Sequence, residues 1–323
     1  MQFVQISDQR SSMGEVRTGV PQGSVLGPLL FSLFINDFPR FIEHGQAVMY
    51  ADDTALLIPH QSAEKAESLA NDSLQKAANW FSTNKLALNV KKTKFIAFTS
   101  RRKSTPVECS LHLDGLPIER VQSYKYLGVT LDENLHWAPH IENLCKKLTS
   151  GCYALIKAQK HFDKNTLRMI YFSVFHNHLI YCIESWGFTF ASYLAKVSTL
   201  QKRAVRIISY APRAIPSKPL FDELNIMPFT NVREYKTAIL VRQIISTNSP
   251  HPSSIFISPK RDTRQAQHNN FNLPIAHNIY GRRSISFIGA KIWNTVPCYM
   301  KYTSNFVSKL KRHYLNKQSD APS

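Results

Sequence analysis

Residues 47–58 read AVMYADDTALLI. Two short apolar runs, 47–50 and 54–58, flank a polar centre that holds Asp52 and Asp53. Two β-rich runs around a short polar turn predict a β-hairpin with both acids near its tip. Carboxylate oxygens are ligands that Mg²⁺ prefers, usually one or two from the protein together with substrate phosphates. An ordinary hairpin with an Asp pair at its turn is the competing interpretation, and this stretch alone leaves both open.

A Gly- and Pro-rich stretch precedes the hairpin. Residues 19–31 read GVPQGSVLGPLLF, and residues 35–37 read IND. Glycine and proline set a turn whose backbone can approach a ligand closely, and the amide of Gln22 can hydrogen-bond to a sugar or a base edge. The apolar residues after this turn predict a helix from Ser24 to about Ile42.

The segments after the hairpin predict an α+β first part and a helical second part. Helical spacing and a start at Ser62 predict a helix over 62–84. Residues 93–98 and 124–131 are predicted strands. Later helices are predicted at 138–161, 165–186, 189–209, 231–246 and 305–315, with a packed segment at 284–293. Three prolines, at 212, 216 and 219, mark a break.

The chain is strongly basic, and its excess charge lies in one half. The formal net charge is +18 and the pI is about 9.7. Residues 151–323 hold 24 Lys and Arg against 7 Asp and Glu, whereas residues 1–150 are near neutral. A basic module attached to a near-neutral one indicates a polyanionic partner, such as nucleic acid.

Other function classes are disfavoured by composition. The five cysteines show no CxxC pair and no regular spacing, which argues against a disulfide scaffold or a zinc ribbon and fits a reducing compartment. The first twenty residues lack the apolar core of a signal peptide. The apolar stretch 25–38 is too short and too polar to span a bilayer. We therefore expect an intracellular protein of the nucleus or cytoplasm, neither secreted nor bound to a membrane.

Four blocks in one order resemble the reverse transcriptases of non-LTR retrotransposons, jockey-like elements in particular. The stretch 19–37 resembles motif B of that family, and Tyr50-Ala51-Asp52-Asp53 is similar to its catalytic motif C. Residues 88–98, LNVKKTKFIAF, resemble motif D, and residues 124–141, YKYLGVTLDENLHWAPHI, resemble the primer grip with the start of the thumb. Residues 280–294 also resemble the C-terminal segment of these proteins.

The resemblance implies a palm and thumb polymerase fold and RNA-templated DNA synthesis from dNTPs with Mg²⁺ or Mn²⁺. Asp52 and Asp53 would be the metal-binding carboxylates, with Asp52 the more direct ligand. Lys92 would donate a proton to pyrophosphate, its competing interpretation being a solvated lysine. The remaining implied contacts are Gln22, Gly23, Tyr50 and Ala51 to the nucleotide, and Tyr126, Leu127 and Gly128 to the primer end.

The sequence departs from the family pattern before residue 19. The family's motif A supplies a third carboxylate upstream of motif B, and the eighteen residues here contain Asp8 and Glu15 but no such block. The basic fingers that bind the triphosphate are not found either. We therefore expect an N-terminally truncated reverse transcriptase with an incompletely liganded metal site, inactive on its own.

The expected architecture is an α+β partial palm, a small antiparallel sheet with helices, followed by a mainly helical thumb and a C-terminal extension. The expected domains are a palm remnant over 1–135, a basic thumb-like region over 136–246, a linker over 247–275 and a basic C-terminal segment over 276–323. The basic half would bind the RNA template and the DNA primer, or their hybrid.

Two other functions remain open from the sequence. A non-catalytic nucleic-acid-binding protein derived from a retrotransposon would keep the basic half for binding alone. A group II intron maturase also carries a YADD sequence, but the GSVLGPLLF and INDFP strings suit the retrotransposon type better.

Overall fold

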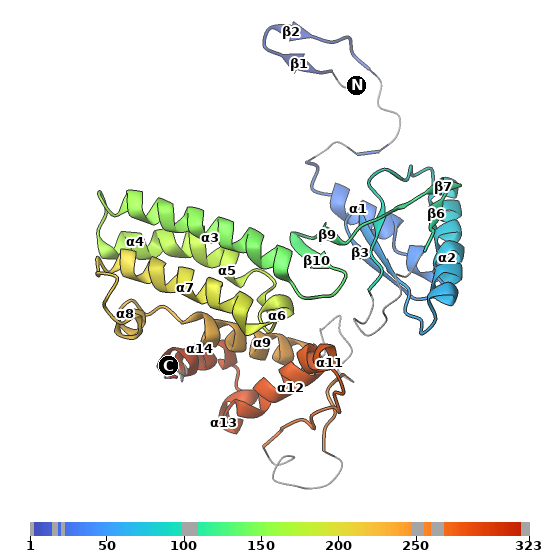
Figure 1. The fold of residues 1–323 in the computed structure, drawn as a ribbon. Helices are drawn as coiled ribbons and strands as arrows, with labels where there is room; N and C mark the ends of the chain where they lie inside the picture. Colours follow the sequence, from blue (N-terminus) through green and yellow to red (C-terminus); the bar gives the residue numbers. More distant parts are fainter. Residues whose placement is uncertain are drawn as a thin grey trace. The chain divides into compact units, whose positions relative to one another are not determined.

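The structure is a computed structural model that describes residues 3–14, 19–20, 23–98, 109–246, 255–259 and 268–317. It divides into two compact units, residues 1–122 and residues 123–323 (Figure 1). We call them unit 1 and unit 2. The division lies before the boundary expected at residue 135, because the segment predicted as a strand over 124–131 packs with the helices that come after it.

Unit 1 is an α+β structure of short elements. Its strands are β1 (Gln5–Ile6), β2 (Gln9–Arg10), β3 (Gln46–Tyr50), β4 (Asp53–Leu57), β5 (Lys94–Phe95), β6 (His112–Leu113), β7 (Leu116–Pro117) and β8 (Glu119–Arg120). Its helices are α1 (Gly27–Phe34), the 3-10 helix η1 (Phe38–Phe41) and α2 (Ala63–Thr83). The pairs β1–β2, β3–β4 and β6–β7 are antiparallel, and β5–β8 is parallel.

Helix α2 holds unit 1 together. Its N-cap Ser62 accepts a hydrogen bond from the Lys65 amide, as the sequence predicts. One side of the helix packs Trp80 against Phe38 of η1, with ring centroids 5.2 Å apart. The other side packs Ala78 against Leu113 of β6. The helix therefore joins the β3–β4 hairpin and the β6–β7 hairpin to two small apolar cores.

Unit 2 starts with the antiparallel hairpin β9 (Ser123–Tyr126) and β10 (Val129–Asp132), and its other described elements are helices and one isolated bridge between Ile257 and Asn272. The first helices are α3 (Ala138–Ala158), α4 (Lys164–Tyr171), the π-helix η2 (Phe172–His176), α5 (Asn177–Ile180), α6 (Ile183–Trp186) and α7 (Ala191–Ile208). The other described helices are α8 (Ser217–Glu223), α9 (Phe229–Ile245), α11 (Ile279–Arg283), α12 (Ile285–Thr295), α13 (Cys298–Lys301) and α14 (Phe306–Asn316).

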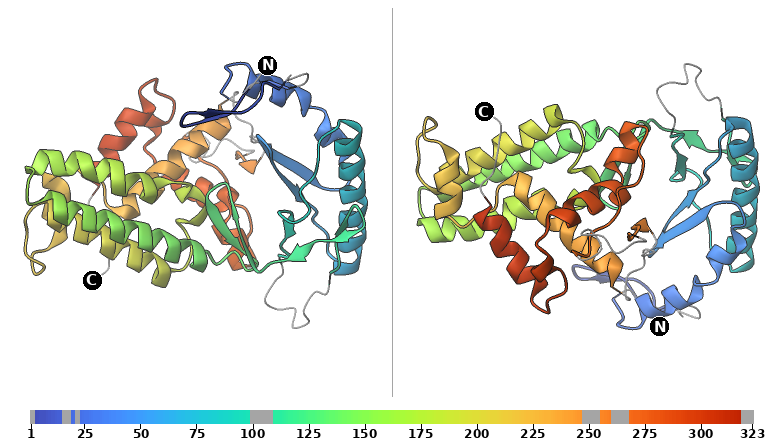
Figure 2. Two further views of the ribbon diagram at one scale, coloured as in Figure 1. Left: turned by 90° about the horizontal axis from the view of Figure 1, so that it is seen from above. Right: turned by 90° about the horizontal axis from the view of Figure 1, so that it is seen from below.

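One apolar core runs through unit 2. Helices α3 and α7 lie side by side (Figure 2), and α9 connects them to α12 and α14. Trp186 of α6 stacks on Phe229 of α9, with ring centroids 6.0 Å apart. Trp293 of α12 is fully buried in the same core. The expected C-terminal segment 276–323 therefore contributes its described helices to the core of the preceding helices.

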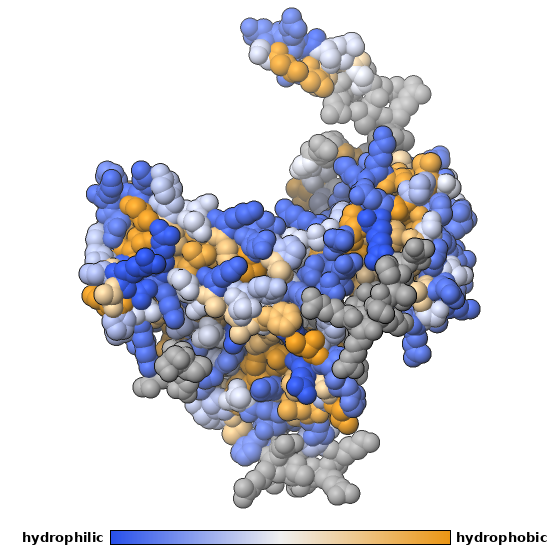
Figure 3. Space-filling model, in the orientation of Figure 1, coloured by the Kyte–Doolittle hydropathy of each residue, from blue (hydrophilic) through white to orange (hydrophobic). Residues whose placement is uncertain are grey.

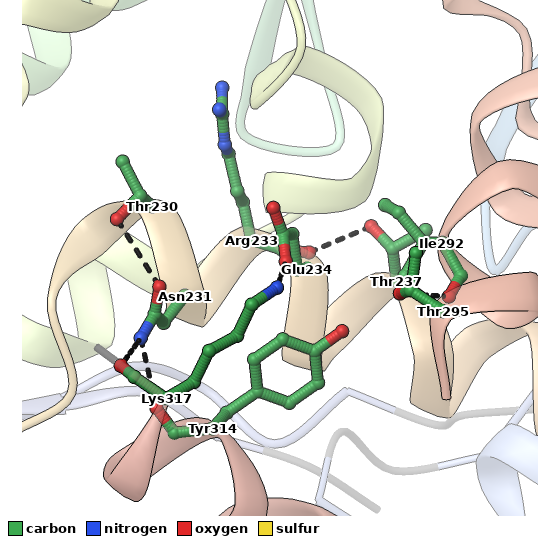
Figure 4. A network of polar contacts seen from close by, with 9 residues as sticks. All are labelled: Thr230, Asn231, Arg233, Glu234, Thr237, Ile292, Thr295, Tyr314 and Lys317. Carbon is green, nitrogen blue, oxygen red and sulfur yellow. Dashed lines mark hydrogen bonds and ion pairs between the residues drawn. The ribbon is translucent and has the colours of Figure 1, made fainter. Parts of the chain in front are cut away.

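Three further contacts join the C-terminal helices to α9. Asn231 Nδ2 donates to the carbonyls of Tyr314 and Lys317 at 2.9 and 3.1 Å, and Lys317 Nζ lies 2.7 Å from a Glu234 carboxylate oxygen (Figure 4).

Inside the expected linker, the described Phe256 and Phe271 stack with centroids 5.0 Å apart and both are buried. Parts of residues 247–275 are thus anchored, while the rest lies outside the described residues.

Several predicted element boundaries are wrong. The helix expected over 24–42 is α1 and η1 with turns between them, and Pro39 lacks the N–H that a continuous helix would use. The helix expected over 165–186 is interrupted after α5, where Cys182 has a φ of 49°. The strand expected over 93–98 is only β5.

The strand expected over 124–131 is also wrong, because the chain reverses within it. Leu127 and Gly128 have φ values of 45° and 81°. Two successive positive φ values form the two-residue turn that joins β9 to β10, and glycine adopts such values at little cost.

Unit 2 is expected to lose stability in mild acid because two of its histidines are held neutral. Burial lowers the pKa of His140 and of His176 to about 4 from 6.5. Between pH 6.5 and 4 both histidines bind fewer protons in the folded state than in the unfolded state. Folding is therefore not penalised above pH 6.5, and the stability of unit 2 is lost progressively as the pH falls toward 4. The unfolding free energy should fall by about 1.4 kcal/mol per pH unit for each histidine inside that window.

Urea unfolding of unit 2 between pH 4 and 7 measures this dependence. His140→Gln should make the dependence shallower, whereas the exposed His178→Gln should leave it unchanged. An equal slope in wild type and in His140→Gln would contradict the assignment.

Candidate functional site

The acidic pair lies at the tip of the β3–β4 hairpin, as the sequence predicts. Tyr50 pairs with Asp53 across the hairpin, which leaves Ala51 and Asp52 as the two turn residues. All four side chains are exposed. The four residues of the YADD sequence therefore lie together at one exposed end of unit 1.

The strands of the hairpin anchor its acidic tip to unit 1. Ala47, Met49 and Leu56 pack against the core that contains Trp80. Side chains alternate between the two faces of a strand, so Tyr50 and Asp53 lie on the face opposite to that core. The apolar face thus anchors the hairpin while the acidic tip stays in solvent.

The turn itself is conformationally restricted. Ala51 has a φ of 52°, a left-handed value that costs an L-residue with a side chain roughly 1–2 kcal/mol. At the start of β3, Gly45 has a φ of 100°, and a Cβ there would lie 2.1 Å from the Leu57 carbonyl oxygen. Only glycine fits at that position, because the Leu57 backbone at the open end of the hairpin lies directly against it.

The donor set at the tip fits a hard divalent cation. Two adjacent carboxylates are exposed, and in the part of the chain that the structure describes neither Asp52 nor Asp53 takes part in an ion pair. Mg²⁺ is commonly held by one or two carboxylates, with waters and substrate phosphates completing its shell. The described residues contain no cluster of three or more Asp, Glu, His or Cys that could hold a metal without such additions.

The Gly-rich turn upstream is described only in part. Gln22 lies outside the described residues. Gly23 is exposed with a φ of 85°, and Ser24 Oγ accepts a hydrogen bond from the Gly27 amide at the start of α1. Helix α1 exposes Leu29, Leu33 and other apolar side chains, so an apolar surface of unit 1 adjoins this turn along the chain (Figure 3).

Lys92 lies on a turn held by Asn89. The Lys92 amide donates to Asn89 Oδ1 at 3.1 Å, and its side chain is exposed. Its neighbour Lys94 is paired with Glu119 of β8 instead. Of the lysines in this motif, Lys92 is therefore the one whose backbone is fixed while its ammonium group faces solvent.

The predicted primer-grip residues form the turn between β9 and β10 in unit 2. The Tyr181 hydroxyl donates to the Leu127 carbonyl at 2.6 Å, and its ring lies 3.2 Å from where a Cβ of Gly128 would be. Tyr126 and Leu127 are half-buried. Sequence reasoning singled out Tyr126, Leu127 and Gly128 but missed Tyr181, which is 53 residues away from Gly128 in the chain and carries no motif of its own.

Removing the Tyr181 hydroxyl should loosen this turn. Tyr181→Phe keeps the ring against Gly128 but leaves the Leu127 carbonyl without this donor, so the unfolding free energy of unit 2 should fall by about 1 kcal/mol. Tyr299→Phe is the matched control, because Tyr299 is 67% exposed. Denaturant unfolding measures both variants, and equal stability of Tyr181→Phe and wild type would contradict this role.

The basic residues of unit 2 divide into two kinds. Arg168 and Arg206 donate to the carbonyls of Leu224 and Ile215, so these guanidinium groups tie helices to loops. The side chains of several others are exposed, among them Lys157, Lys160, Lys202 and Arg203. The exposed group can meet a polyanion without a change in the fold.

Comparison with known proteins agrees with these motifs. Residues 2–131 match the family described as reverse transcriptase (RNA-dependent DNA polymerase). The chain is 29% identical to the RNA-directed DNA polymerase from mobile element jockey of Drosophila melanogaster, over 78% of this chain and 28% of that protein. It is 31% identical to a probable RNA-directed DNA polymerase from transposon BS of the same species, over 69% of this chain and 26% of that protein.

The chain spans about a quarter of the length of the curated relatives that it matches. No solved structure matches it. Among the described helices, none combines the length and the apolar character that a membrane crossing needs.

Proposed function

We infer the function from a family membership: residues 2–131 are a reverse transcriptase domain, of the kind found in retrotransposons. The domain belongs to RNA-directed DNA polymerases of non-LTR elements. We extend this to the reaction itself, in which nucleotides pass from dNTPs to a primer 3′ end on an RNA template. The observation that carries the proposal is the YADD sequence at an exposed, tightly closed hairpin tip.

In this proposal the chain's own residues position the reactants. Asp52 and Asp53 would hold the divalent metal, with Asp52 the more direct ligand. Tyr50, Ala51, Gln22 and Gly23 would lie against the incoming nucleotide, and Lys92 would give a proton to the leaving pyrophosphate. The bound metal would lower the pKa of the primer hydroxyl and neutralise charge on the phosphates. Tyr126, Leu127 and Gly128 would hold the primer end.

The resemblance implies a third carboxylate, from motif A, that the 323 residues do not contain. The reaction is therefore tested in two polypeptides: the 323 residues alone, and the same residues joined behind the fingers and motif A of the jockey polymerase. Extension of an oligo(dT) primer on poly(rA) with Mg²⁺ is the readout. We expect extension by the second polypeptide and little or none by the first.

The alternative is a non-catalytic nucleic-acid-binding protein, and the charge of residues 151–323 favours it as a second candidate. It would be supported if the joined polypeptide bound hybrid but did not extend the primer. A joined polypeptide that neither binds nor extends would contradict both functions.

Binding of an RNA–DNA hybrid by unit 2 is expected to be independent of sequence and strongly dependent on salt. Lys and Arg that neutralise phosphates release counterions, so log K falls with log salt by about 0.9 for each phosphate contacted. Fluorescence anisotropy with hybrids of two unrelated sequences, between 50 and 300 mM salt, measures this slope on the full chain. An affinity that does not change over this range would contradict phosphate binding.

A further inference from the structure

Three parts of unit 2 meet at the loop between α6 and α7, which consists of Gly187, Phe188, Thr189 and Phe190. Thr189 Oγ1 donates to the carbonyl of His136, just before α3, at 2.7 Å. The His136 ring packs edge-on against Phe190 at 5.1 Å. The two phenylalanines of the loop are each covered by an arginine from a different helix.

The first arginine comes from α9. Arg233 Nη1 donates to the Gly187 carbonyl at 3.1 Å, and its guanidinium carbon lies 5.1 Å from the centre of the Phe188 ring. Its Nε is buried and has no hydrogen-bond partner in the described part of the chain. Figure 4 shows this side chain extending away from the contacts that Asn231 and Glu234 of the same helix make with Lys317, which follows α14.

The second arginine comes from α11, within the Tyr280–Ser284 segment. The guanidinium carbon of Arg283 lies 3.9 Å from the centre of the Phe190 ring. Its Nη1 is also buried without a hydrogen-bond partner among the described residues. Phe188 and Phe190 are two residues apart, so their Cα atoms lie within about 7 Å of each other. Both guanidinium groups therefore border one short loop.

Neither arginine forms an ion pair with a carboxylate in the residues that the structure describes, although Glu234 acts on Arg233 electrostatically. The nearby acids on α6 and α9 are already engaged, Glu184 with Lys236 at 3.8 Å and Glu234 with Lys317 at 2.7 Å. Burial partly desolvates the charged forms of both arginines and so lowers their pKa from the ordinary value. A desolvated charge without a partner is costly, and an aromatic face compensates only in part.

An anion with several oxygen acceptors would supply the partner that each of these groups lacks. A guanidinium group donates through a planar fork that matches the oxygens of a phosphate, and such charge-assisted hydrogen bonds are about twice as strong as neutral ones. Carboxylates of this chain do not fill that role among the described residues, and the net charge of residues 151–323 is +17.

We propose that Arg233 and Arg283, presented on the Phe188 and Phe190 rings, form a binding site for the phosphodiester backbone of a nucleic-acid strand. The inference rests on the proposed function, because it assigns part of the nucleic-acid contact to this loop. It makes the Tyr280–Ser284 segment part of the binding surface in addition to its place in the core.

The test compares neighbouring arginines in the full chain. Arg283→Gln and Arg233→Gln should weaken binding of a fluorescein-labelled RNA–DNA hybrid about tenfold and make the salt slope shallower by about one each. Arg282→Gln removes the same charge from an exposed neighbour, and Arg242→Gln removes it from the same helix as Arg233. These controls should lose far less affinity. Equal losses in all four variants would overturn the site and leave general charge attraction.

A second measurement separates failure of the site from failure of the function. Inorganic phosphate should raise the Tm of wild type and Arg282→Gln above that in chloride of equal ionic strength, and Arg283→Gln should lose this gain. If wild type binds no hybrid, the proposed nucleic-acid function fails, and the phosphate result decides whether the anion site exists. Arg283→Lys, which keeps the charge but not the fork, guards against loss of fold and should keep the Tm of wild type in chloride. An equal phosphate gain in Arg283→Gln and Arg282→Gln would contradict the site.

Discussion

Replacing Asp52 by asparagine, in the polypeptide joined to fingers and motif A, is expected to lower the rate of primer extension by about 10²–10³-fold. Asparagine keeps the size of the side chain but removes the negative charge that would hold the metal. The turn should persist, because Asp52 is exposed and the hairpin is anchored by Ala47, Met49 and Leu56 on its other face. Single-turnover extension on poly(rA) with oligo(dT) measures the loss.

The chain supplies a matched control for this substitution in Asp114. It is also an exposed aspartate in a two-residue hairpin turn, between β6 and β7, with a φ of 51°. Asp114→Asn removes the same charge from another two-residue hairpin turn of unit 1 and should leave the rate unchanged. Hybrid binding should survive in both variants, since the basic residues lie in unit 2. An Asp52→Asn rate equal to that of Asp114→Asn would refute the catalytic assignment.

Truncating Trp293 to alanine is expected to lower the unfolding free energy of unit 2 by about 3–5 kcal/mol. The side chain is fully buried, its Nε1 donates to the Asn269 carbonyl at 3.0 Å, and its ring packs against Phe306 with centroids 5.8 Å apart. The Lys301 ammonium lies 5.4 Å from the ring. The substitution leaves a cavity and also removes a contact that holds residues 268–270.

Denaturant unfolding followed by circular dichroism measures this effect. Tyr299→Ala, an exposed aromatic on the neighbouring helix α13, is the control and should change stability little. The result bears on how the C-terminal helices belong to the fold. If residues 276–323 were an independent segment, Trp293→Ala would leave the unfolding of α3 and α7 unchanged, and that outcome would contradict a shared core.

Local sequence patterns determined much of unit 2. Helices α3, α7, α9 and α14 lie close to their predicted ranges because apolar residues recur at helical spacing and Pro139 and Pro228 mark two of the starts. The interruption after α5 escaped prediction. The side chains on both sides of the interruption continue a helical apolar pattern. The break depends on the left-handed backbone at Cys182 and on the hydrogen bond that Trp186 Nε1 donates to the Tyr181 carbonyl.

The hairpins show the limit of periodicity more clearly. The YADD hairpin was predicted, since a polar turn separates its two runs. The β9–β10 hairpin was not, because its turn residues Leu127 and Gly128 include an apolar side chain and no polar break. Tyr181, from a distant part of the chain, closes over that turn.

The resemblance to reverse transcriptases, the acidic hairpin tip and the basic second half can be read from the order of residues, because each depends on residues that are neighbours in the chain. Only the packing of the helices reveals that the C-terminal helices complete one core with the preceding helices. It also reveals that Arg233 and Arg283, 50 residues apart, border the same loop. The physical reason is that burial and ion pairing depend on which surfaces meet in space. The spacing of residues along the chain does not indicate whether a charged side chain lies next to an oppositely charged one in the folded protein.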